Sequence, residues 1–562
     1  MAATQFSEKS IPARALLQRK QLFNHLIDGL AQTRPEAAWA KIPKNELTYE
    51  SGYRKVSYKM MANAINGLAW WIKDELGGSE SFETLAYFGL WDPRYILLLL
   101  AAVKVGYKVY QAPLSQSRSF LTTSQMIFPS NSYNIGGLTK LLDPLECKTI
   151  LLSSKQLDIG SKLSHTKWNL HEIPSLAELL DKEYRHFPFM KTFEEARSEP
   201  LVVVHTSGTT GAPKPVIWTH DWAAAFVQRN QAAPPYGHAS IDSLYRGIEC
   251  CPATPPNHPS SIWPNLFGSI SNSTVVLYPL PSAPLTTETA MEMIRHNNPE
   301  FLLALPYLLV GLASNKKYIE EISSKVSQIG FAGGPLPKAA GDILTRHFKV
   351  YTMFGTSELG LVHKIVPHGP WNSNIWNSFK PHPKDNFEFR AIGNDVYEAV
   401  IIRNTDDEEL QPVFKAFPSF EEWHTKDFFF KDPIRDGFWI YGGRIDNIII
   451  LRNGGSIDPS EFEDRMNMVP FVKRVLMCGD GKPQTALLVE LNDPAADDSD
   501  IFEAVWKEVD GCNQNSGPYA IVAKSHVILT SPDRLIPTSA KGSIQRSLAL
   551  ELYAEELEEL YQ

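Results

Sequence analysis

A loop rich in hydroxyl groups, with two glycines and one lysine, is the part of this sequence best suited to chemistry. It runs His205-Thr-Ser-Gly-Thr-Thr-Gly-Ala-Pro-Lys-Pro215, between two short apolar runs that predict strands, Leu201–Val204 and Val216–His220. Glycines let backbone N–H groups approach an anion, hydroxyls add donors, and Lys214 adds positive charge. The loop therefore predicts a phosphate cradle. It is not a Walker loop, because Pro213 stands where that motif has the glycine before its lysine.

Five further motifs follow this loop along the chain. A lone loop of this kind is more often a flexible turn, and each later motif alone also fits a turn or a helix cap. Their common order and spacing is the specific signal. The five are Gly330-Phe-Ala-Gly-Gly-Pro-Leu-Pro337, Tyr351-Thr-Met-Phe-Gly-Thr-Ser-Glu358, Thr425-Lys-Asp427, Gly443-Arg-Ile-Asp446 and Pro537-Thr-Ser-Ala-Lys-Gly-Ser-Ile-Gln-Arg546.

This set of motifs resembles the adenylate-forming, AMP-binding superfamily of acyl-CoA synthetases, luciferases and nonribosomal peptide synthetase (NRPS) adenylation domains. The resemblance covers nearly the whole chain. The spelling Gly211-Ala-Pro-Lys-Pro-Val-Ile-Trp-Thr-His220 is most similar to the adenylation domain of fungal NRPS-like carboxylate reductases, where a carrier and a reductase domain follow. The ending, Glu551–Tyr561, resembles the segment ahead of their carrier domain.

The resemblance implies an α/β fold with two domains. A large N-terminal adenylate-forming domain of layered α/β subdomains would occupy residues 1–443, and a small mobile α+β domain would occupy residues 444–562. Asp446 matches the family's hinge, where few residues absorb the backbone change as the small domain swings. Gly454 and Gly455 would line the path of a pantetheine arm.

The resemblance also implies a function for the motifs in binding ATP and Mg²⁺. The loop and Lys214 would hold the departing phosphates, and Thr206 is also a catalytic candidate. The glycines at 333 and 334 would lie against adenine, and Phe354 would stack on it where the family usually has Tyr. The implied nucleotide-binding residues are Thr206, Ser207, Gly208, Thr209, Thr210, Gly211, Lys214, His258, Gly333, Gly334, Phe354, Gly355, Thr356, Ser357, Asp427 and Arg444.

Three carboxylate or lysine side chains carry the chemistry that the resemblance implies. Glu358 would bind Mg²⁺, a hard cation that prefers carboxylate oxygen. Asp427 would accept hydrogen bonds from the ribose hydroxyls, with Arg444 assisting. Attack of a carboxylate on the α-phosphate brings two anions together, and Lys541 would offset that charge.

The stretch from His258 to Trp263 matches the region that bounds the acyl pocket in this family. Amino-acid-activating relatives carry an Asp there to pair with the substrate's ammonium group, and aligning that pattern here puts Pro259 at its position. An unpaired buried ammonium is costly, so we expect a carboxylic acid without an α-amino group, aryl or short aliphatic. For any one aromatic candidate for the pocket wall, an ordinary core position is the commoner alternative. The candidates are His258, Pro259, Trp263, Phe267, Tyr307 and Phe331.

Strands and helices must alternate to place these motifs. From Leu201 to about Gly360 the pattern is βαβ, which predicts a layered sheet with ligands beyond the carboxyl ends of its strands. Residues 1–60 predict a helical lead-in with a polar turn at Pro43–Glu46. Ser547–Gln562 predicts an acidic amphipathic helix exposed to solvent, and residues 111–126 predict a surface loop that the relatives lack.

The composition restricts the classes of binding partner and the cellular compartment that we expect for this protein. A net charge of −9 argues against nucleic acid, and the most apolar runs are too short for a membrane span of about 20 residues. Five scattered cysteines indicate neither a zinc site nor a disulfide framework, which favours a reducing, cytoplasmic setting.

Three functions stay open at this point. The first is a domain that activates an acid and passes it to the phosphopantetheine thiol of a carrier domain, in cis or in trans. The sequence after Lys541 contains no carrier serine motif, so the carrier would lie elsewhere. The second is a free-standing acyl-CoA ligase that uses CoA. The third is an inactive binding protein that kept the fold, against which the presence of Lys541, Glu358 and Asp427 argues.

Overall fold

The computed structural model describes most of the chain. It covers residues 20–77, 84–106, 126–127, 135–154, 162–164, 166–205, 214–368, 375–393, 395–453, 456–493, 499–538 and 544–561. Several predictions from sequence lie outside these ranges: the loop Thr206–Pro213, Gly454 and Gly455, Lys541, and nearly all of the surface loop at 111–126.

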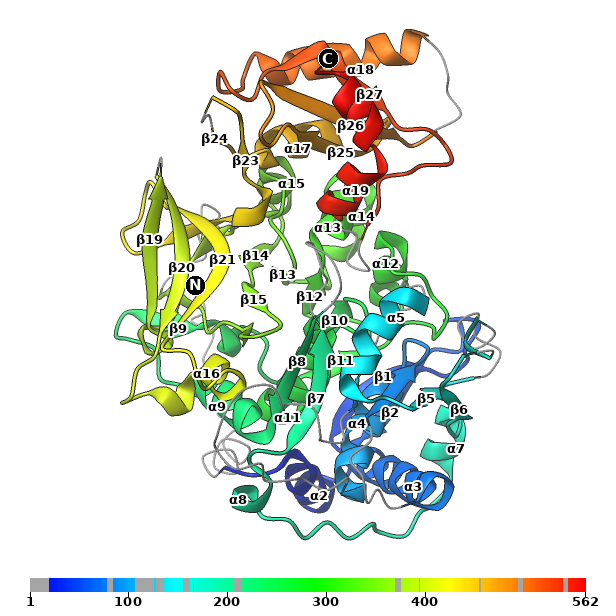
Figure 1. Cartoon of the computed structure of the whole chain (residues 1–562). Helices are drawn as coiled ribbons and strands as arrows, with labels where there is room; N and C mark the ends of the chain where they lie inside the picture. Colours follow the sequence, from blue (N-terminus) through cyan, green and yellow to red (C-terminus); the bar gives the residue numbers. More distant parts are fainter. Residues whose placement is uncertain are drawn as a thin grey trace.

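Two mixed sheets form the centre of the large N-terminal part (Figure 1). In each sheet the strands run parallel except one at an edge, β2 in the first and β8 in the second. The first, in spatial order, is β14 (Lys349–Thr352), β13 (Gln328–Phe331), β12 (Phe301–Ala304), β10 (Glu249–Ala253), β11 (Val275–Leu277), β1 (Ala38–Pro43) and β2 (Tyr53–Ser57). The second is β6 (Asn169–Glu172), β5 (Thr149–Leu152), β3 (Leu85–Phe88), β4 (Met126–Ile127), β7 (Pro200–His205) and β8 (Pro215–Thr219).

Helices cover both sheets and close three hydrophobic cores. The largest core joins the two sheets through α2 (Phe23–Thr33), α3 (Tyr58–Leu76), α4 (Arg94–Val105) and α9 (His220–Gln231). The first sheet's other face packs on α12 (Thr287–Arg295), α13 (Pro306–Ala313), α14 (Lys316–Ile322) and α15 (Lys338–Leu344). The second sheet's other face packs on α5 (Ile135–Leu142) and η1 (Asp143–Leu145). Smaller elements at the periphery are α7 (Leu176–Asp181), α8 (Phe193–Ala196), η2 (Ile241–Leu244), η6 (Glu408–Leu410) and α16 (Pro412–Ala416).

A third, antiparallel sheet follows in the chain and packs its own aromatic core (Figure 1, yellow). Its spatial order is β18 (Ser378–Phe379), β22 (Trp439–Arg444), β21 (Glu422–Lys431), β20 (Val396–Ile402) and β19 (Phe387–Gly393). There are also two short antiparallel pairs: the hairpin of β15 (Gly355–Thr356) with β16 (Gly360–Leu361), and the long-range pair of β9 (His238–Ser240) with β17 (Ile365–Pro367). The short 3-10 helix η5 (Pro383–Asp385) precedes β19.

The last part of the chain builds two cores from residues between Ile449 and Tyr561. They lie on opposite faces of a three-stranded sheet, β25 (Val472–Cys478), β26 (Thr485–Leu491) and β27 (Val522–Leu529), shown in orange to red in Figure 1. The chain enters this part through η7 (Ile445–Asn447), β23 (Ile449–Ile450) and β24 (Ser456–Ile457). Its helices are α17 (Ser460–Asn467), α18 (Ser499–Asn513), α19 (Arg546–Leu552) and α20 (Ala554–Glu559). The expected α/β class with a large first domain and a small last one is confirmed.

Two predictions about the chain's ends were wrong. The first 60 residues are not a helical lead-in throughout, because β1 and β2 pair with each other and β1 joins the first sheet beside β11. The last residues form two short helices, and Ala549, Tyr553 and Leu557 bury one face against the small sheet. In both cases tertiary packing determined the secondary structure and burial of the segment, and the local periodicity of the sequence does not reveal such long-range contacts. Within the described ranges, every helix is too short or too polar to cross a bilayer.

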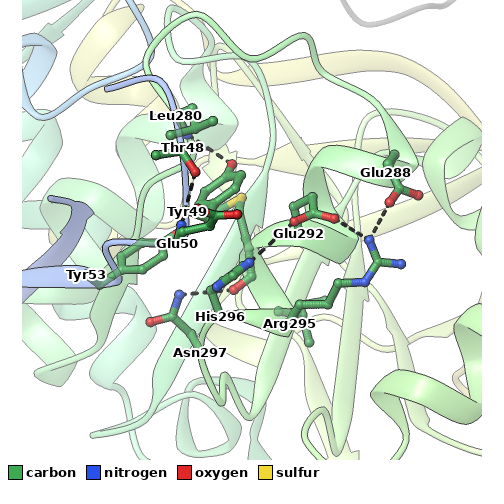
Figure 2. A network of polar contacts seen from close by, with 12 residues as sticks. Thr48, Tyr49, Glu50, Tyr53, Leu280, Glu288, Glu292, Arg295, His296 and Asn297 are labelled. Atoms are coloured by element: carbon green, nitrogen blue, oxygen red, sulfur yellow. Dashed lines mark hydrogen bonds and ion pairs between the residues drawn. The ribbon is translucent and has the colours of Figure 1, made fainter. Parts of the chain in front are cut away.

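A polar network on the surface joins α12 to the segment that follows β1. Figure 2 shows Arg295, in the last turn of α12, beside Glu288 and Glu292. On its other side His296 stacks on Tyr49, with 5.4 Å between ring centroids. These contacts attach the end of α12 to the segment between β1 and β2.

Candidate active site

The strands β7 and β8 pair antiparallel and bring together the two ends of the predicted phosphate loop. His205 lies opposite Pro215, and Lys214 is exposed beside them. The hydroxyl of Ser357 donates to the His205 carbonyl oxygen at 3.3 Å. The structure therefore places the β15–β16 turn directly against the start of the phosphate loop.

The β15–β16 hairpin presents Thr356, Ser357 and Glu358 on a tight turn. A side chain at Gly355 would approach the Gly360 carbonyl oxygen to 2.7 Å, so the two strands meet only because that position is glycine. Gly360 has a φ of +65°, which also favours glycine. The Leu359 N–H donates to the Thr356 hydroxyl at 3.2 Å and closes the turn.

The hairpin's backbone is held from behind by residues that the sequence analysis missed. The indole N–H of Trp218 donates to the Ser357 carbonyl at 2.7 Å, and that of Trp222 donates to the Glu358 carbonyl at 3.1 Å. The Arg229 guanidinium donates to the carbonyls of both Leu359 and Leu361 at 2.9 and 2.5 Å. The available signal was weak: Trp222 and Arg229 lie seven residues apart, on one face of α9, and Trp218 precedes them on β8.

A buried carboxylate marks the predicted ribose position. Asp427 on β21 is paired in register with Arg444 on β22, and the Tyr441 hydroxyl donates to it at 3.1 Å. Burial raises the pKa of Asp427 to about 7, although Arg444, 3.7 Å away, lowers it. Phe354 packs 5.6 Å from the Tyr441 ring, within the aromatic core. Tyr441 thus links the predicted adenine and ribose contacts, and sequence analysis did not identify it.

The predicted adenine-side glycines follow β13. Gly333 has a φ of +95°, a conformation that favours glycine, and a side chain at Gly334 would meet only the Pro306 ring, at 4.0 Å. The Met353 N–H donates to the Phe331 carbonyl at 2.8 Å, which aligns this turn with the segment leading to Phe354.

A composite helix carries the predicted acyl-pocket residues. His258 caps its first turn, since its Nδ1 accepts from the Ser260 N–H at 3.0 Å, and Pro259 is the first helical residue. The helix continues as α10 (Pro259–Ile262), the π-helix η3 (Trp263–Gly268) and α11 (Ser269–Asn272). Inserted π-turns are frequent at functional sites. Here the carbonyl of Asn265 accepts from the Trp39 indole at 3.1 Å.

The remaining pocket candidates are dispersed. Trp263 and Phe267 are buried in the large core, and Phe331 lies in the core beneath α12–α15, 5.9 Å from the Trp376 ring. Tyr307 is 41% exposed, and its hydroxyl donates to the Leu285 carbonyl at 3.0 Å. The structure brings His258, Pro259 and Trp263 together and places Tyr307 and Phe331 in different surroundings.

The residues flanking Lys541 are fixed by buried charges. Thr538 pairs with Ile544 in an antiparallel bridge, and the Ile536 N–H donates at 2.8 Å to Glu490, whose side chain is fully buried. On the far side Arg546 pairs with Glu463 at 2.8 Å. At the predicted hinge, Asp446 lies 3.6 Å from Arg444.

Two family models match this chain. Residues 35–384 match the AMP-binding enzyme model, and residues 446–562 match the AMP-binding enzyme C-terminal domain. Among curated relatives, a carboxylic acid reductase of Neurospora crassa is 25% identical over 97% of this chain and 51% of its own length. An isocyanide synthase–NRPS hybrid of Aspergillus fumigatus is 27% identical over 96% of this chain and 33% of its own length. The chain thus spans about half the length of these relatives or less.

Solved structures share the fold at low identity. An anthranilate CoA ligase in complex with anthranoyl-AMP superposes with a TM-score of 0.69 at 14% identity, covering 96% of this chain and 98% of that one. ATP-bound MatB from Rhodopseudomonas palustris superposes with a TM-score of 0.67 at 14% identity, covering 96% and 99%.

Proposed function

Because this chain belongs to the AMP-binding enzyme family, we propose that it activates a carboxylic acid with ATP as an AMP-forming ligase. A carboxylate oxygen would form a bond to the α-phosphorus while the bond from that phosphorus to the β-phosphate oxygen breaks. The products are an acyl-AMP and pyrophosphate. The observation that carries this proposal is the contact between the Ser357 hydroxyl and the end of β7, because it joins the α-phosphate turn to the phosphate loop.

Different residues around that contact would bind different parts of ATP. Lys214 and the loop Thr206–Gly211 would hold the β- and γ-phosphates, and Thr356 and Ser357 would donate to the α-phosphate. Asp427, facing Arg444 and Tyr441, would accept from the ribose hydroxyls. Lys541 would come to the α-phosphate and offset the charge of the approaching carboxylate.

The single carboxylate at the tip of the hairpin fits Mg²⁺. Magnesium is usually bound by one or two carboxylates together with substrate phosphates, and Glu358 lies on the turn beside Thr356 and Ser357. When bound, the ion would neutralise phosphate charge. Glu358 would hold it, and the backbone of the turn would keep that carboxylate in place.

The acid would lack an α-amino group. Residues 254–287, which contain the whole composite helix, include no Asp or Glu to pair with an ammonium. Pro259 occupies the first turn of α10, and the buried hydroxyl of Ser261 is already hydrogen-bonded to Thr254. A buried ammonium without a partner would weaken binding strongly. An aryl or short aliphatic acid fits this lining.

The acyl group would then pass to the thiol of a phosphopantetheine arm on a carrier domain, in cis or in trans. Support comes from the curated relatives, which include a fungal carboxylic acid reductase and an NRPS hybrid, both longer than this chain. We further propose a swing of the domain at 444–562 about Asp446, with Gly454 and Gly455 beside the pantetheine, and a place in fungal secondary metabolism. The rival acceptor is free CoA, as the anthranilate CoA ligase fold neighbour suggests.

The test is acid-dependent ATP–pyrophosphate exchange over a panel of aryl, aliphatic and amino acids. We expect exchange with acids that lack an α-amino group and a loss of about 100-fold or more in Lys541→Ala, the size seen when one transition-state donor is removed. Exchange with proteinogenic amino acids alone would contradict the substrate class. Unchanged adenylate formation in Lys541→Ala would contradict the mechanism, and no exchange with any acid would favour a binding protein.

A second assay separates the two acceptors. Purified protein with ATP and its preferred acid is offered free CoA or a phosphopantetheinylated carrier domain, and thioester formation is followed by mass spectrometry. The proposal predicts acyl transfer to the carrier. Efficient transfer to CoA, with none to the carrier, would instead identify an acyl-CoA ligase.

A further inference from the structure

Four backbone carbonyls of the β15–β16 hairpin accept hydrogen bonds from side chains of one neighbouring segment. They belong to Ser357, Glu358, Leu359 and Leu361, and the donors are Trp218, Trp222 and Arg229. All three donors lie within β8 and α9, directly after the phosphate loop. One continuous segment thus supplies both Lys214 and the support of the turn that carries Glu358.

The hairpin lies flat against this segment. The indole rings of Trp218 and Trp222 stack at 4.1 Å with 7° between their planes, and Phe226 continues the stack at 5.4 Å. A side chain at Gly360 would collide with Phe226 at 2.7 Å and with Trp222 at 2.9 Å. The glycine therefore allows the backbone to approach the ring face closely enough for the indole N–H groups to reach the carbonyls.

Arg229 is the donor whose placement is hardest to explain by stability alone. Its side chain is 4% exposed, and its nearest anion, Asp385, is 3.6 Å from Nε and is itself 2% exposed. Burial lowers the pKa of Arg229. Replacing a buried ion pair with apolar residues is often neutral or stabilising, so a pair of this kind is weak evidence for a stabilising function. Its guanidinium instead donates from one nitrogen, Nη2, to two carbonyls of the hairpin, Leu359 and Leu361.

We propose that Trp218, Trp222 and Arg229 are positioning residues that fix Ser357 and Glu358 relative to the phosphate loop. Their action is indirect: they hold backbone carbonyls, and the hairpin's side chains then meet the α-phosphate and Mg²⁺. The inference rests on the proposed adenylation. The inference extends that proposal: these three residues would set the Mg²⁺ requirement and the rate of adenylation without contacting the nucleotide.

The experiment uses the full chain with Trp222→Phe, Trp218→Phe and Arg229→Lys, and with Arg295→Lys as a matched surface control. Phenylalanine keeps an aromatic ring in the stack and removes the N–H donor together with part of the buried ring volume. The readouts are kcat and the KM for acid in ATP–pyrophosphate exchange, and the Mg²⁺ concentration that gives half-maximal exchange. Circular dichroism and thermal unfolding report whether each variant is folded.

We expect the half-maximal Mg²⁺ concentration to rise about fivefold in each tryptophan variant, the equivalent of one lost hydrogen bond, with the KM for acid unchanged. Arg229→Lys should show a smaller rise than a variant with no cation, Arg229→Met, if both fold. Arg295→Lys should match wild type. A purely structural effect would lower the active fraction, and hence kcat, without moving the Mg²⁺ dependence.

The wild-type measurement distinguishes failure of the proposed adenylation from failure of the positioning proposal. Absence of exchange in wild type would overturn the proposed adenylation itself. Robust exchange in wild type, with an unchanged Mg²⁺ dependence in folded Trp218→Phe and Trp222→Phe, would overturn the positioning proposal and leave adenylation standing. If Arg229→Lys does not fold, the two tryptophan variants still decide the matter.

Discussion

Arg229 and Arg295 occupy the same place in two similar helices and meet opposite surroundings. Each lies in the last turn of its helix, α9 or α12, and each helix is capped by a threonine hydroxyl, Thr219 or Thr286. At the surface Arg295 contacts Glu288 and Glu292, as Figure 2 shows, and it also pairs with Glu321. Hydrogen bonds to these carboxylates raise its pKa. Arg229 is buried with one carboxylate and two backbone carbonyls, and burial lowers its pKa.

The difference shows which polar network belongs to the site. A cation among three surface carboxylates gains little from each, because water screens the charges and could replace any of them. A buried cation that donates to backbone carbonyls has no such substitute, so the backbone it holds is fixed in one arrangement. By the number of ion pairs, Arg295 would be judged the more important of the two arginines. Burial and the backbone carbonyl acceptors instead indicate that Arg229 is the one that supports the site.

The largest expected contrast between the two arginines is in folding stability. Arg229→Met leaves Asp385 buried without a counter-ion and two carbonyls without a donor, so we expect a loss of about 3–5 kcal/mol in the free energy of unfolding. Arg295→Met should cost about 1 kcal/mol or less, since its partners are solvated. Urea denaturation of both variants measures this, and equal costs would break the comparison.

A smaller contrast is expected between two indole donors. Trp222→Phe leaves the Glu358 carbonyl without its donor in a largely buried site, which should cost about 1 kcal/mol of unfolding free energy. Trp70 donates in the same way to the Arg185 carbonyl at 3.0 Å, but at the surface, where water can take over. Trp70→Phe is therefore the matched control with a cost of a few tenths of a kcal/mol. A larger cost for Trp70→Phe would contradict the account.

The smallest contrast concerns pH and Asp385. Burial raises the pKa of Asp385 to about 7, against the lowering effects of Arg229 and of a hydrogen bond with the His382 backbone. The His382 ring stacks on that of His363. A raised carboxyl pKa in the folded state gives stability that is full below the unfolded pKa and is lost as the pH rises through about 7.

Asparagine mimics the protonated form of Asp385, so Asp385→Asn should match wild type below about pH 4, where the carboxyl is protonated in both the folded and the unfolded state. Relative to wild type it should gain on the order of 1 kcal/mol between pH 5 and pH 8. Chemical denaturation at a series of pH values gives the difference directly. A relative loss of stability by the variant as the pH rises would show that the pair with Arg229 outweighs burial.

Most motifs of the predicted nucleotide site could be found in the sequence because they are contiguous, glycine-containing stretches, although Thr425–Asp427 has no glycine and lies within β21. Gly333 illustrates the glycine motifs, since its positive φ angle favours glycine. The support of the site was not predictable in the same way. Trp218 and Arg229 contact residues 139 and 130 positions away, and local patterning shows only that they are aromatic or charged.

The substrate side illustrates the same limit. His258 and Pro259 begin one helix in the structure, as a capping side chain followed by proline often does, but sequence analysis considered them only as pocket residues and did not predict that helix. Phe331 was a plausible pocket wall by type, yet it packs on Trp376 beneath α12–α15. Aromatic residues serve cores and pockets alike, and only the tertiary packing separates the two uses.

The most direct test of the central claim is a crystal structure of the full chain with a non-hydrolysable acyl-adenylate analogue and Mg²⁺. The account predicts the ribose hydroxyls on Asp427, the phosphate mimic within hydrogen-bond distance of Thr356 and Ser357, and the acyl group beside His258 and Pro259. The carbonyls of Ser357 and Glu358 should still accept from Trp218 and Trp222. A nucleotide bound away from the β15–β16 hairpin, or a hairpin released from both indoles, would contradict it.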